Sequence, residues 1–399
     1  NGNVIDEVLV SYFKAPKSYT TENMCEINSH GGNVVVKKIL ELCLKNGAEL
    51  AEPGEFTKRA FLNGRIDLLQ AESVIDVINA KSEREAKNGI KQLEGFLSNE
   101  IAKIKQEIMD VMINIEVAID YPEYDVDDVT SNQINEMLVT VENKLVKLSK
   151  SFDNGKIIKE GIKTAIIGRP NAGKSSLLNA ILKEDRAIVT EYEGTTRDTI
   201  EEFVNINGIP LKLVDTAGIR DAKDEVEKIG IAKSKEIAKD ADLIIAIFDA
   251  SKDLGKEDLE ILELIKNKKA IILLNKTDLK EKINENDQKI KETGATVIKI
   301  SALKREGIEN LYDEITKMFD LNQINLDQET VITNVRHKNL IDQAIESTKK
   351  AKDTMEQKMP IDIIAIFIKD ILEDLGKITG EIVTDDIIDE IFSKFCLGK

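Results

Sequence analysis

The stretch GRPNAGKS at residues 168–175 constrains the fold more than any other feature, because it is a complete GxxxxGK[ST] phosphate-binding loop. An apolar run at residues 162–167 precedes it, and residues 177–182 continue with apolar side chains at helical spacing. Such a loop works between a buried parallel strand and a helix, where backbone N–H groups and the helix N-terminus attract phosphate. Lys174 would reach the β- and γ-phosphates, and Ser175 would ligate Mg²⁺. On its own, the motif could also be a chance glycine turn.

Two further segments predict the phosphate side of the same site. The sequence DTAG at residues 215–218 ends an apolar strand, so Asp215 can hold Mg²⁺ through water and the Gly218 N–H can contact the γ-phosphate. The sequence GTTRD at residues 194–198 lies between the two motifs and supplies a threonine, Thr196, for Mg²⁺. Doubly wound sheets bind ligands at the carboxyl ends of their strands, which is where these motifs fall.

Two more segments select the base. The sequence NKTD at residues 275–278 ends an apolar strand, and a carboxylate at Asp278 can accept both N–H donors on the ring edge of guanine. Adenine does not offer that pattern. Ser301 and Ala302 follow the strand predicted at residues 296–300, where a backbone amide can donate to the guanine oxygen. The ordered motifs therefore predict guanine nucleotide binding by a Ras-like P-loop GTPase domain of the α/β class.

The residues predicted to contact GTP come from all five motifs. They are Asn171, Ala172, Gly173, Lys174, Ser175, Ser176, Thr195, Thr196, Asp215, Gly218, Asn275, Lys276, Asp278, Ser301 and Ala302.

Composition argues against several other classes of protein. The 399-residue chain has no secretory signal and no run of roughly 18–20 apolar residues that could span a membrane. Its three cysteines, Cys25, Cys43 and Cys396, lack zinc-site spacing, which fits a reducing cytoplasm. Only two histidines, His30 and His337, are present, which makes a histidine metal site or a Ser–His triad improbable. The formal net charge of −17 repels RNA, so RNA binding would need a local basic patch or a partner protein.

Periodicity divides the chain into regions. Residues 155–322 alternate between strand and helix patterns, as an α/β unit does. Residues 65–154 and 323–399 carry apolar side chains at helical spacing, and we expect them to pack together as one all-helical domain interrupted by the α/β unit. Residues 1–64 indicate only a small α+β piece. One predicted helical stripe comprises Leu97, Ile101, Ile104, Ile108, Val111, Ile115 and Ala118.

The chain closely resembles the MnmE (TrmE) family of tRNA-modifying GTPases over essentially its whole length. Besides the nucleotide motifs, the matching segments are HGG at residues 30–32, residues 53–64, and FCLGK at residues 395–399. The terminal Cys-x-Gly-Lys makes the resemblance specific beyond GTPases in general. The match begins inside the family's N-terminal domain, so we expect this chain to be N-terminally truncated.

The resemblance implies three domains: a tetrahydrofolate-binding and dimerising N-terminal domain, which is partial here, a helical domain, and an inserted G domain. It implies a cytoplasmic homodimer, without membrane attachment, that acts on tRNA with an FAD-dependent MnmG-type partner. Together the two proteins would add an aminomethyl-type group to carbon 5 of the wobble uridine, using a one-carbon unit from a tetrahydrofolate derivative. The resemblance further implies that K⁺ and G-domain dimerisation promote hydrolysis of Mg²⁺-bound GTP.

The resemblance also implies a catalytic arrangement unlike that of Ras. Ile219 stands where Ras-like proteins carry a water-aligning glutamine, and it has no hydrogen-bonding group. The family assigns that role to Glu227, although an acid there also suits the first turn of a helix. Asn171 would offer a side-chain oxygen to K⁺, and it also suits a tight turn. Arg197 could act as an internal arginine finger, but a switch-stabilising role fits better with use of the ion.

Cys396 completes the predicted catalytic residues, together with Lys174 and Glu227. Its functional interpretation is a role in the modification centre, and its structural alternative is a small apolar anchor for the last helix. The residues matched to the folate side are Glu55, Arg59, Asn63 and Lys399. Helix capping and salt bridging would explain the first three nearly as well.

A regulatory GTPase in ribosome assembly is the alternative function. An RNA-binding GTPase of that kind should carry a basic domain after the G domain. This chain instead ends in an acidic helical segment and the tail at residues 396–399. A scaffold with a silent nucleotide site is disfavoured because the motif set is intact.

Overall fold

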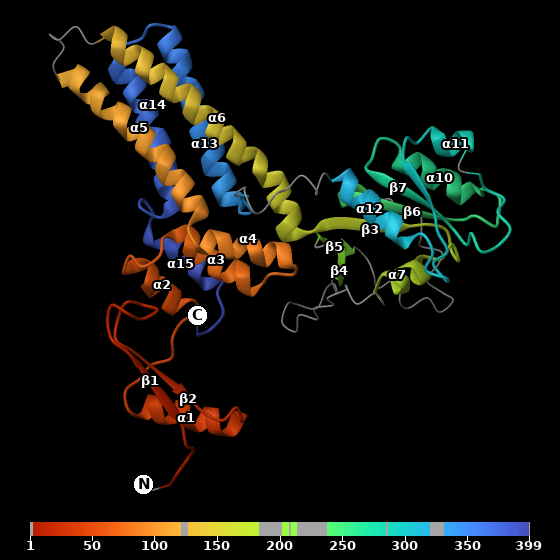
Figure 1. Cartoon of the computed structure of the whole chain (residues 1–399), viewed down its shortest axis with the longest axis horizontal. Coiled ribbons are helices and arrows are strands. Elements are labelled where there is room, and N and C mark those ends of the chain that lie inside the picture. The colour runs from red at the N-terminus through yellow and green to blue at the C-terminus, as the bar shows by residue number, and fades with distance from the viewer. Residues whose placement is uncertain are drawn as a thin grey trace. The chain divides into compact units, whose positions relative to one another are not determined.

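The computed structural model comprises two compact units (Figure 1). One unit contains residues 1–79, 89–149 and 335–399, and the other contains residues 80–88 and 150–334. The structure describes residues 3–120, 127–182, 202–206, 209–213, 238–284, 286–319 and 331–398. Within those ranges, no helix is both long enough and apolar enough to cross a membrane.

The second unit is built on a six-stranded sheet with the order β4-β5-β3-β6-β7-β8. The pairs β3–β5, β3–β6, β6–β7 and β7–β8 are parallel, whereas β4 is antiparallel to β5. The strands are β3 (Ile162–Ile167), β4 (Glu202–Ile206), β5 (Ile209–Leu213), β6 (Leu243–Asp249), β7 (Ala270–Asn275) and β8 (Thr296–Lys299). Its helices among the described residues include α7 (Lys174–Leu182), α10 (Lys256–Ile265), α11 (Gln288–Lys291) and α12 (Ile308–Met318). This arrangement confirms the predicted α/β class.

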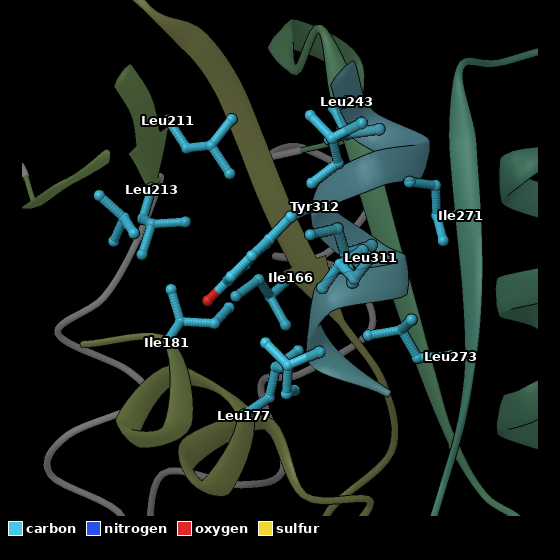
Figure 2. Close-up of a cluster of buried hydrophobic side chains, with 14 of the residues drawn as sticks. Ile166, Leu177, Ile181, Leu211, Leu213, Leu243, Ile271, Leu273, Leu311 and Tyr312 are labelled. Atoms are coloured by element: carbon cyan, nitrogen blue, oxygen red, sulfur yellow. The ribbon is translucent and has the colours of Figure 1, made fainter. Parts of the chain in front are cut away.

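The central strands are buried on both faces, as parallel strands between helical layers must be. Along β6, Ile245 and Ile247 join an apolar cluster that includes residues of α7 and α12. The alternate residues Ile244 and Phe248 join a second cluster, which includes residues of α10 and α11. Figure 2 shows the first cluster, in which Tyr312 of α12 lies among side chains from β3, β5 and α7. The alternation follows from the two-residue period of a strand.

The first unit consists mainly of long helices. They are α3 (Leu68–Ile78), α5 (Phe96–Asp120), α13 (Val335–Glu356), α14 (Ile361–Thr379) and α15 (Asp385–Ser393), while α4 (Glu83–Leu93) and α6 (Asp127–Glu160) extend beyond its limits. The buried stripe of α5 matches the predicted one except that Met112 is buried in place of Val111. Met112 lies four residues after Ile108 and three before Ile115, so it continues the same apolar face at helical spacing.

The N-terminal residues form a small hairpin-and-helix piece of this first unit. Its elements are β1 (Leu9–Phe13), β2 (Met24–Asn28), α1 (Asn33–Lys45) and α2 (Glu55–Leu62). The two strands pair in antiparallel fashion, and no residue of α1 is buried.

The C-terminal tail packs against the start of α2. Gly54 has φ +69°, and a Cβ there would lie 2.9 Å from both the Phe392 carbonyl oxygen and the Phe395 Cβ. The Gly54 N–H donates to the Cys396 carbonyl oxygen at 3.3 Å. Glycine is therefore required at position 54 by both its backbone conformation and the close approach of the tail.

A buried charged group joins α3 to α13. Glu72 on α3 accepts from the His337 Nε2 at 2.5 Å and from the Arg336 Nε at 3.2 Å. The Arg336 Nη1 also donates to the Lys377 carbonyl oxygen at 2.9 Å. Burial raises the pKa of Glu72, but the charges and hydrogen bonds of His337 and Arg336 outweigh burial and lower this pKa to about 2. The carboxylate therefore stabilises the folded helices only while it is ionised.

We expect Glu72→Gln to lower the free energy of unfolding by about 3 kcal/mol at pH 7, because it leaves Arg336 and His337 without their buried counter-charge. The loss should shrink as the pH falls from 4.5, the ordinary glutamate value, towards 2, because the parent carboxylate then becomes protonated as well. Urea unfolding monitored by circular dichroism over this pH range measures the difference. Glu346→Gln, which removes an exposed ion pair with Lys350 on α13, is the matched control and should change little. Equal effects of the two substitutions would contradict the assignment.

Candidate nucleotide-binding site

The predicted phosphate loop connects β3 to α7. Gly168 lies so close to β6 that a Cβ would fall 2.5 Å from the Ile247 carbonyl oxygen. Gly173 has φ +109°, and a Cβ there would fall 2.0 Å from the Asn275 Nδ2. Asn171 also adopts a left-handed backbone, with φ +61°. The loop therefore needs glycine at both ends of its curve and tolerates asparagine between them.

The lysine of the motif lies over the loop. Its Nζ donates to the Gly168 carbonyl oxygen at 2.8 Å and to the Arg169 carbonyl oxygen at 3.0 Å. Lys174 begins α7, so its charge lies at the helix N-terminus, where backbone N–H groups attract anions. Ser175 and Ser176 lie in the first turn of the same helix and are exposed. The arrangement can hold a phosphate group beside a hydroxyl suited to Mg²⁺.

Asn275 ties the phosphate loop to the predicted base-binding loop. Its Nδ2 donates to the Ala172 carbonyl oxygen at 2.8 Å, and its Oδ1 accepts from the Ala302 N–H at 3.0 Å. The side chain lies at the end of β7 and is only 2% exposed. Lys276 adds a second tie, because its Nζ donates to the Asn171 carbonyl oxygen at 2.8 Å. The structure thus brings together three of the predicted loops, and it gives Asn275 and Lys276 an internal bonding role.

Asp278 is held in place by Ser301. The Ser301 hydroxyl donates to the Asp278 Oδ1 at 2.7 Å. This hydrogen bond is the main reason why the pKa of Asp278 is lowered, so the carboxylate is ionised at neutral pH. An ionised carboxylate can only accept hydrogen bonds. Its chemistry therefore matches the two donors on the guanine edge.

Asp249, at the end of β6, is a site residue that the sequence reasoning missed. It is 1% exposed and accepts from the Lys276 Nζ at 2.8 Å and from the Ser251 hydroxyl at 2.6 Å. Although burial raises the pKa of Asp249, the bonds from Lys276 and Ser251 outweigh burial and lower it. An acid closing an otherwise apolar strand was the available sequence signal. Asp249 fixes the Lys276 ammonium, which in turn holds the phosphate loop.

Several predicted site residues lie outside the described ranges. These are Thr195, Thr196, Asp215, Gly218, Glu227 and Lys399, together with Ile219 and Arg197.

Of the residues predicted for the folate side, Glu55 begins α2, Arg59 lies in its middle and Asn63 follows its last residue. Glu55 pairs with Arg59 at 2.6 Å, and the Glu52 N–H, together with Arg59, lowers the pKa of Glu55. The Arg59 Nη1 also lies 3.3 Å from the Glu22 Oε2. At the far end, the Asn63 Nδ2 donates to the Thr20 carbonyl oxygen at 2.7 Å.

A cavity adjoins the C-terminal end of α2. Its volume is about 590 Å³, and its lining includes Asn63, Tyr19 and Arg65. Cys396 is exposed, and its backbone lies against Gly54 at the other end of the helix. A helix of eight residues separates the two ends by about 12 Å along its axis. Cys396 and Asn63 thus lie at opposite ends of one short helix.

Comparisons with known proteins cover the whole chain. Residues 68–396 match the family described as the MnmE helical domain, and residues 1–65 match the GTP-binding protein TrmE N-terminus. A tRNA modification GTPase MnmE from Acetivibrio thermocellus is 50% identical over 100% of this chain and 87% of its own length. The protein of the same description from Clostridioides difficile is 52% identical over the same shares. Among solved structures, the G domain of the T. maritima FeoB iron transporter is 26% identical over 39% of this chain and 98% of that chain, with a TM-score of 0.29.

Proposed function

Because this chain belongs to the MnmE (TrmE) family of tRNA modification GTPases, we propose that its GTP hydrolysis supports the addition of an aminomethyl-type group to carbon 5 of the wobble uridine of tRNA. The observation that carries the proposal is the hydrogen-bonded group at the ends of β6 and β7. Asn275 and Lys276 donate hydrogen bonds to the phosphate loop there, and Asp278 provides an ionised carboxylate suited to guanine. The proposed domains are a partial N-terminal tetrahydrofolate-binding and dimerisation domain at residues 1–64, a helical domain formed by residues 65–154 and 323–399, and a G domain at residues 155–322.

We assign the steps of GTP binding to residues of the predicted motifs. Lys174 and the loop amides would hold the β- and γ-phosphates, and Ser175, Thr196 and Asp215 would hold Mg²⁺, as the motifs imply. When bound, Mg²⁺ neutralises charge on the phosphate oxygens. The exposed Ser175 hydroxyl, in the first turn of α7, has the chemistry this ion requires.

Glu227 is our proposed water-positioning residue, and Asn171 our proposed K⁺ ligand. Asn171 is exposed and lies at the left-handed bend of the phosphate loop, so its amide oxygen is available to a cation. When bound, K⁺ supplies positive charge near the β–γ bridge, where negative charge develops during hydrolysis. Such an ion would take the place of an arginine finger, and G domains of a homodimer would complete the site.

We expect GTP turnover to rise by about tenfold or more when K⁺ replaces Na⁺ at constant ionic strength, since the ion stabilises charge in the transition state. Asn171→Ala should abolish this ion preference while Mg·GTP binding remains. Fixed ionic strength matters because added salt also screens the repulsion between acidic protomers. Steady-state turnover of parent and variant in matched salts is the measurement.

The control for this experiment is Asn267→Ala. Asn267 is likewise exposed and left-handed, with φ +62°, but it lies outside the nucleotide motifs. Its substitution therefore reproduces the backbone strain without removing the proposed ligand. Equal parent rates in K⁺ and Na⁺ would contradict the potassium mechanism and favour Arg197 as the charge-stabilising group.

The one-carbon chemistry is proposed for the N-terminal piece and the C-terminal tail. The cavity beside Asn63 offers aromatic, amide and guanidinium groups, which suit a flat heterocycle such as that of a tetrahydrofolate derivative. Glu55, Arg59 and Lys399 are the other proposed folate-side residues, and Cys396 is the proposed reactive group. An FAD-dependent MnmG-type protein would act as the partner on tRNA.

Nucleoside analysis of tRNA tests the proposed function directly. Cells lacking the protein should lose the modified wobble uridine, and the parent gene should restore it. Cys396→Ser should fail to restore it while retaining GTP hydrolysis. Unchanged tRNA nucleosides in the deletion strain would contradict the proposal.

A further inference from the structure

A buried ion pair fastens the phosphate loop to helix α10. The Arg169 Nη1 lies 2.9 Å from the Asp258 Oδ2. The Asp258 side chain is fully buried, and the Arg169 side chain is 16% exposed. The same Nη1 donates to the Asp253 carbonyl oxygen at 3.5 Å, just ahead of α10. Arg169 is the second residue of the phosphate loop. Neither Arg169 nor Asp258 is among the residues predicted to contact GTP, so the pair would act on the loop and not on the nucleotide itself.

We propose that Arg169 and Asp258 are a positioning pair that holds the beginning of the phosphate loop in its binding shape and thereby slows nucleotide release. The Arg169 carbonyl oxygen accepts from the Nζ of Lys174, the lysine predicted to bind phosphate. Any shift of the Arg169 backbone therefore moves a partner of that ammonium. The proposal rests on the assignment of the chain as a GTPase and adds two residues to it.

Helix α10 is a firm support for this pair. Asp258 also accepts from the Gly255 N–H at 2.9 Å, which closes the first turn of the helix as the third residue of a capping box does. Ile261, Leu262 and Ile265 of α10 belong to the apolar cluster on one face of the sheet. The carboxylate is therefore held both by its own helix and by the packed core behind it. Through the ion pair with Asp258, Arg169 restrains the loop.

The beginning and the middle of the loop have separate supports. Asn275 and Lys276 hold the middle through the Ala172 and Asn171 carbonyl oxygens. Only Arg169 connects the beginning to α10 among the contacts described above. A loop that must be ordered when the ligand arrives binds less tightly than one that is already in shape. Loss of the pair should therefore appear in nucleotide affinity and release, and only weakly in the chemical step.

The pair uses only part of its hydrogen-bonding capacity. Among the described residues, the buried Arg169 Nη2 and the buried Asp258 Oδ1 have no hydrogen-bond partner. A single close N···O ion pair thus carries the contact, so the ammonium of a lysine at position 169 can supply an equivalent charge. Conservative replacement should accordingly preserve the function of the pair.

The test is stopped-flow release of a fluorescent GDP analogue, combined with steady-state GTP turnover. Arg169→Ala and Asp258→Ala should each raise the release rate and the KM for GTP on the order of tenfold, with kcat changed less than about threefold. Arg169→Lys should stay close to the parent. The double variant should resemble either single variant, because the two residues act as a unit. Asp258→Asn, which keeps the side-chain shape, replaces Asp258→Ala if the latter does not fold.

Lys282→Ala is the matched control, because it removes an exposed ion pair with Asp253 in the same region. It should leave release unchanged. The proposed positioning pair would be overturned if both single variants released the nucleotide at the rate of the control. It would also be overturned if the effects of the two substitutions multiplied in the double variant. Failure of the parent to bind or hydrolyse GTP would instead overturn the GTPase assignment on which it rests.

Discussion

Asp278→Asn is expected to lower GTP affinity by about a hundredfold or more, because the base loses two charge-assisted hydrogen bonds. The substitution also turns an amide N–H₂ group towards the N–H donors of guanine, which adds repulsion between like partners. The fold should be unaffected, since Asp278 is only half-buried and an asparagine Oδ1 can still accept from the Ser301 hydroxyl. Isothermal titration calorimetry with GTP gives the affinity directly.

A second nucleotide and a control variant test whether the Asp278 carboxylate recognises the base. Xanthosine triphosphate carries an oxygen where guanine carries its amino group, so it should bind the asparagine variant better than GTP does. Asp253→Asn, at a surface position 83% exposed, is the control and should bind GTP like the parent. Equal GTP affinity of parent and Asp278→Asn would show that the carboxylate does not recognise the base.

Glu227→Ala is expected to keep GTP affinity and to lower kcat on the order of a hundredfold or more, because the role we propose for this carboxylate is to orient the attacking water. The reason lies in Ile219, which cannot align water as a glutamine would. Single-turnover hydrolysis with pre-bound GTP separates the chemical step from binding. Glu225→Ala, two residues earlier in the same acidic segment, is the matched control. Parallel losses of affinity and turnover would indicate a structural role for Glu227.

Much of the α/β unit could be predicted from local sequence. The phosphate loop and the apolar strands each depend on short-range rules, and the structure places the described ones as predicted. The assignment to the α/β class followed from the order of strands and helices. Local periodicity was less reliable at single positions, as the burial of Met112 in place of Val111 shows.

The side-chain partnerships could not be predicted in the same way. Glu72 and His337 are 265 residues apart, and no periodicity connects them. The pairing of Arg169 with Asp258 depends on where α10 packs on the sheet, which a sequence pattern does not specify. Lys276 was predicted to contact GTP, whereas its bonds to Asp249 and to the phosphate loop follow from the adjacency of β6 and β7. Long-range contacts of this kind require the topology of the sheet and of the helices.

The packing of the tail against Gly54 has a consequence for synthesis on the ribosome. The unit with the six-stranded sheet is complete once residue 334 has been made. The partners of Glu72 and Gly54, in contrast, lie at residues 336–337 and 392–396. Chains are made from the N-terminus and domains generally fold as units. Gly54 and Glu72 must therefore wait for partners that are made much later in the chain. The inserted unit can mature in the interval, before residues 336–337 and 392–396 close the remaining structure around α2 and α3.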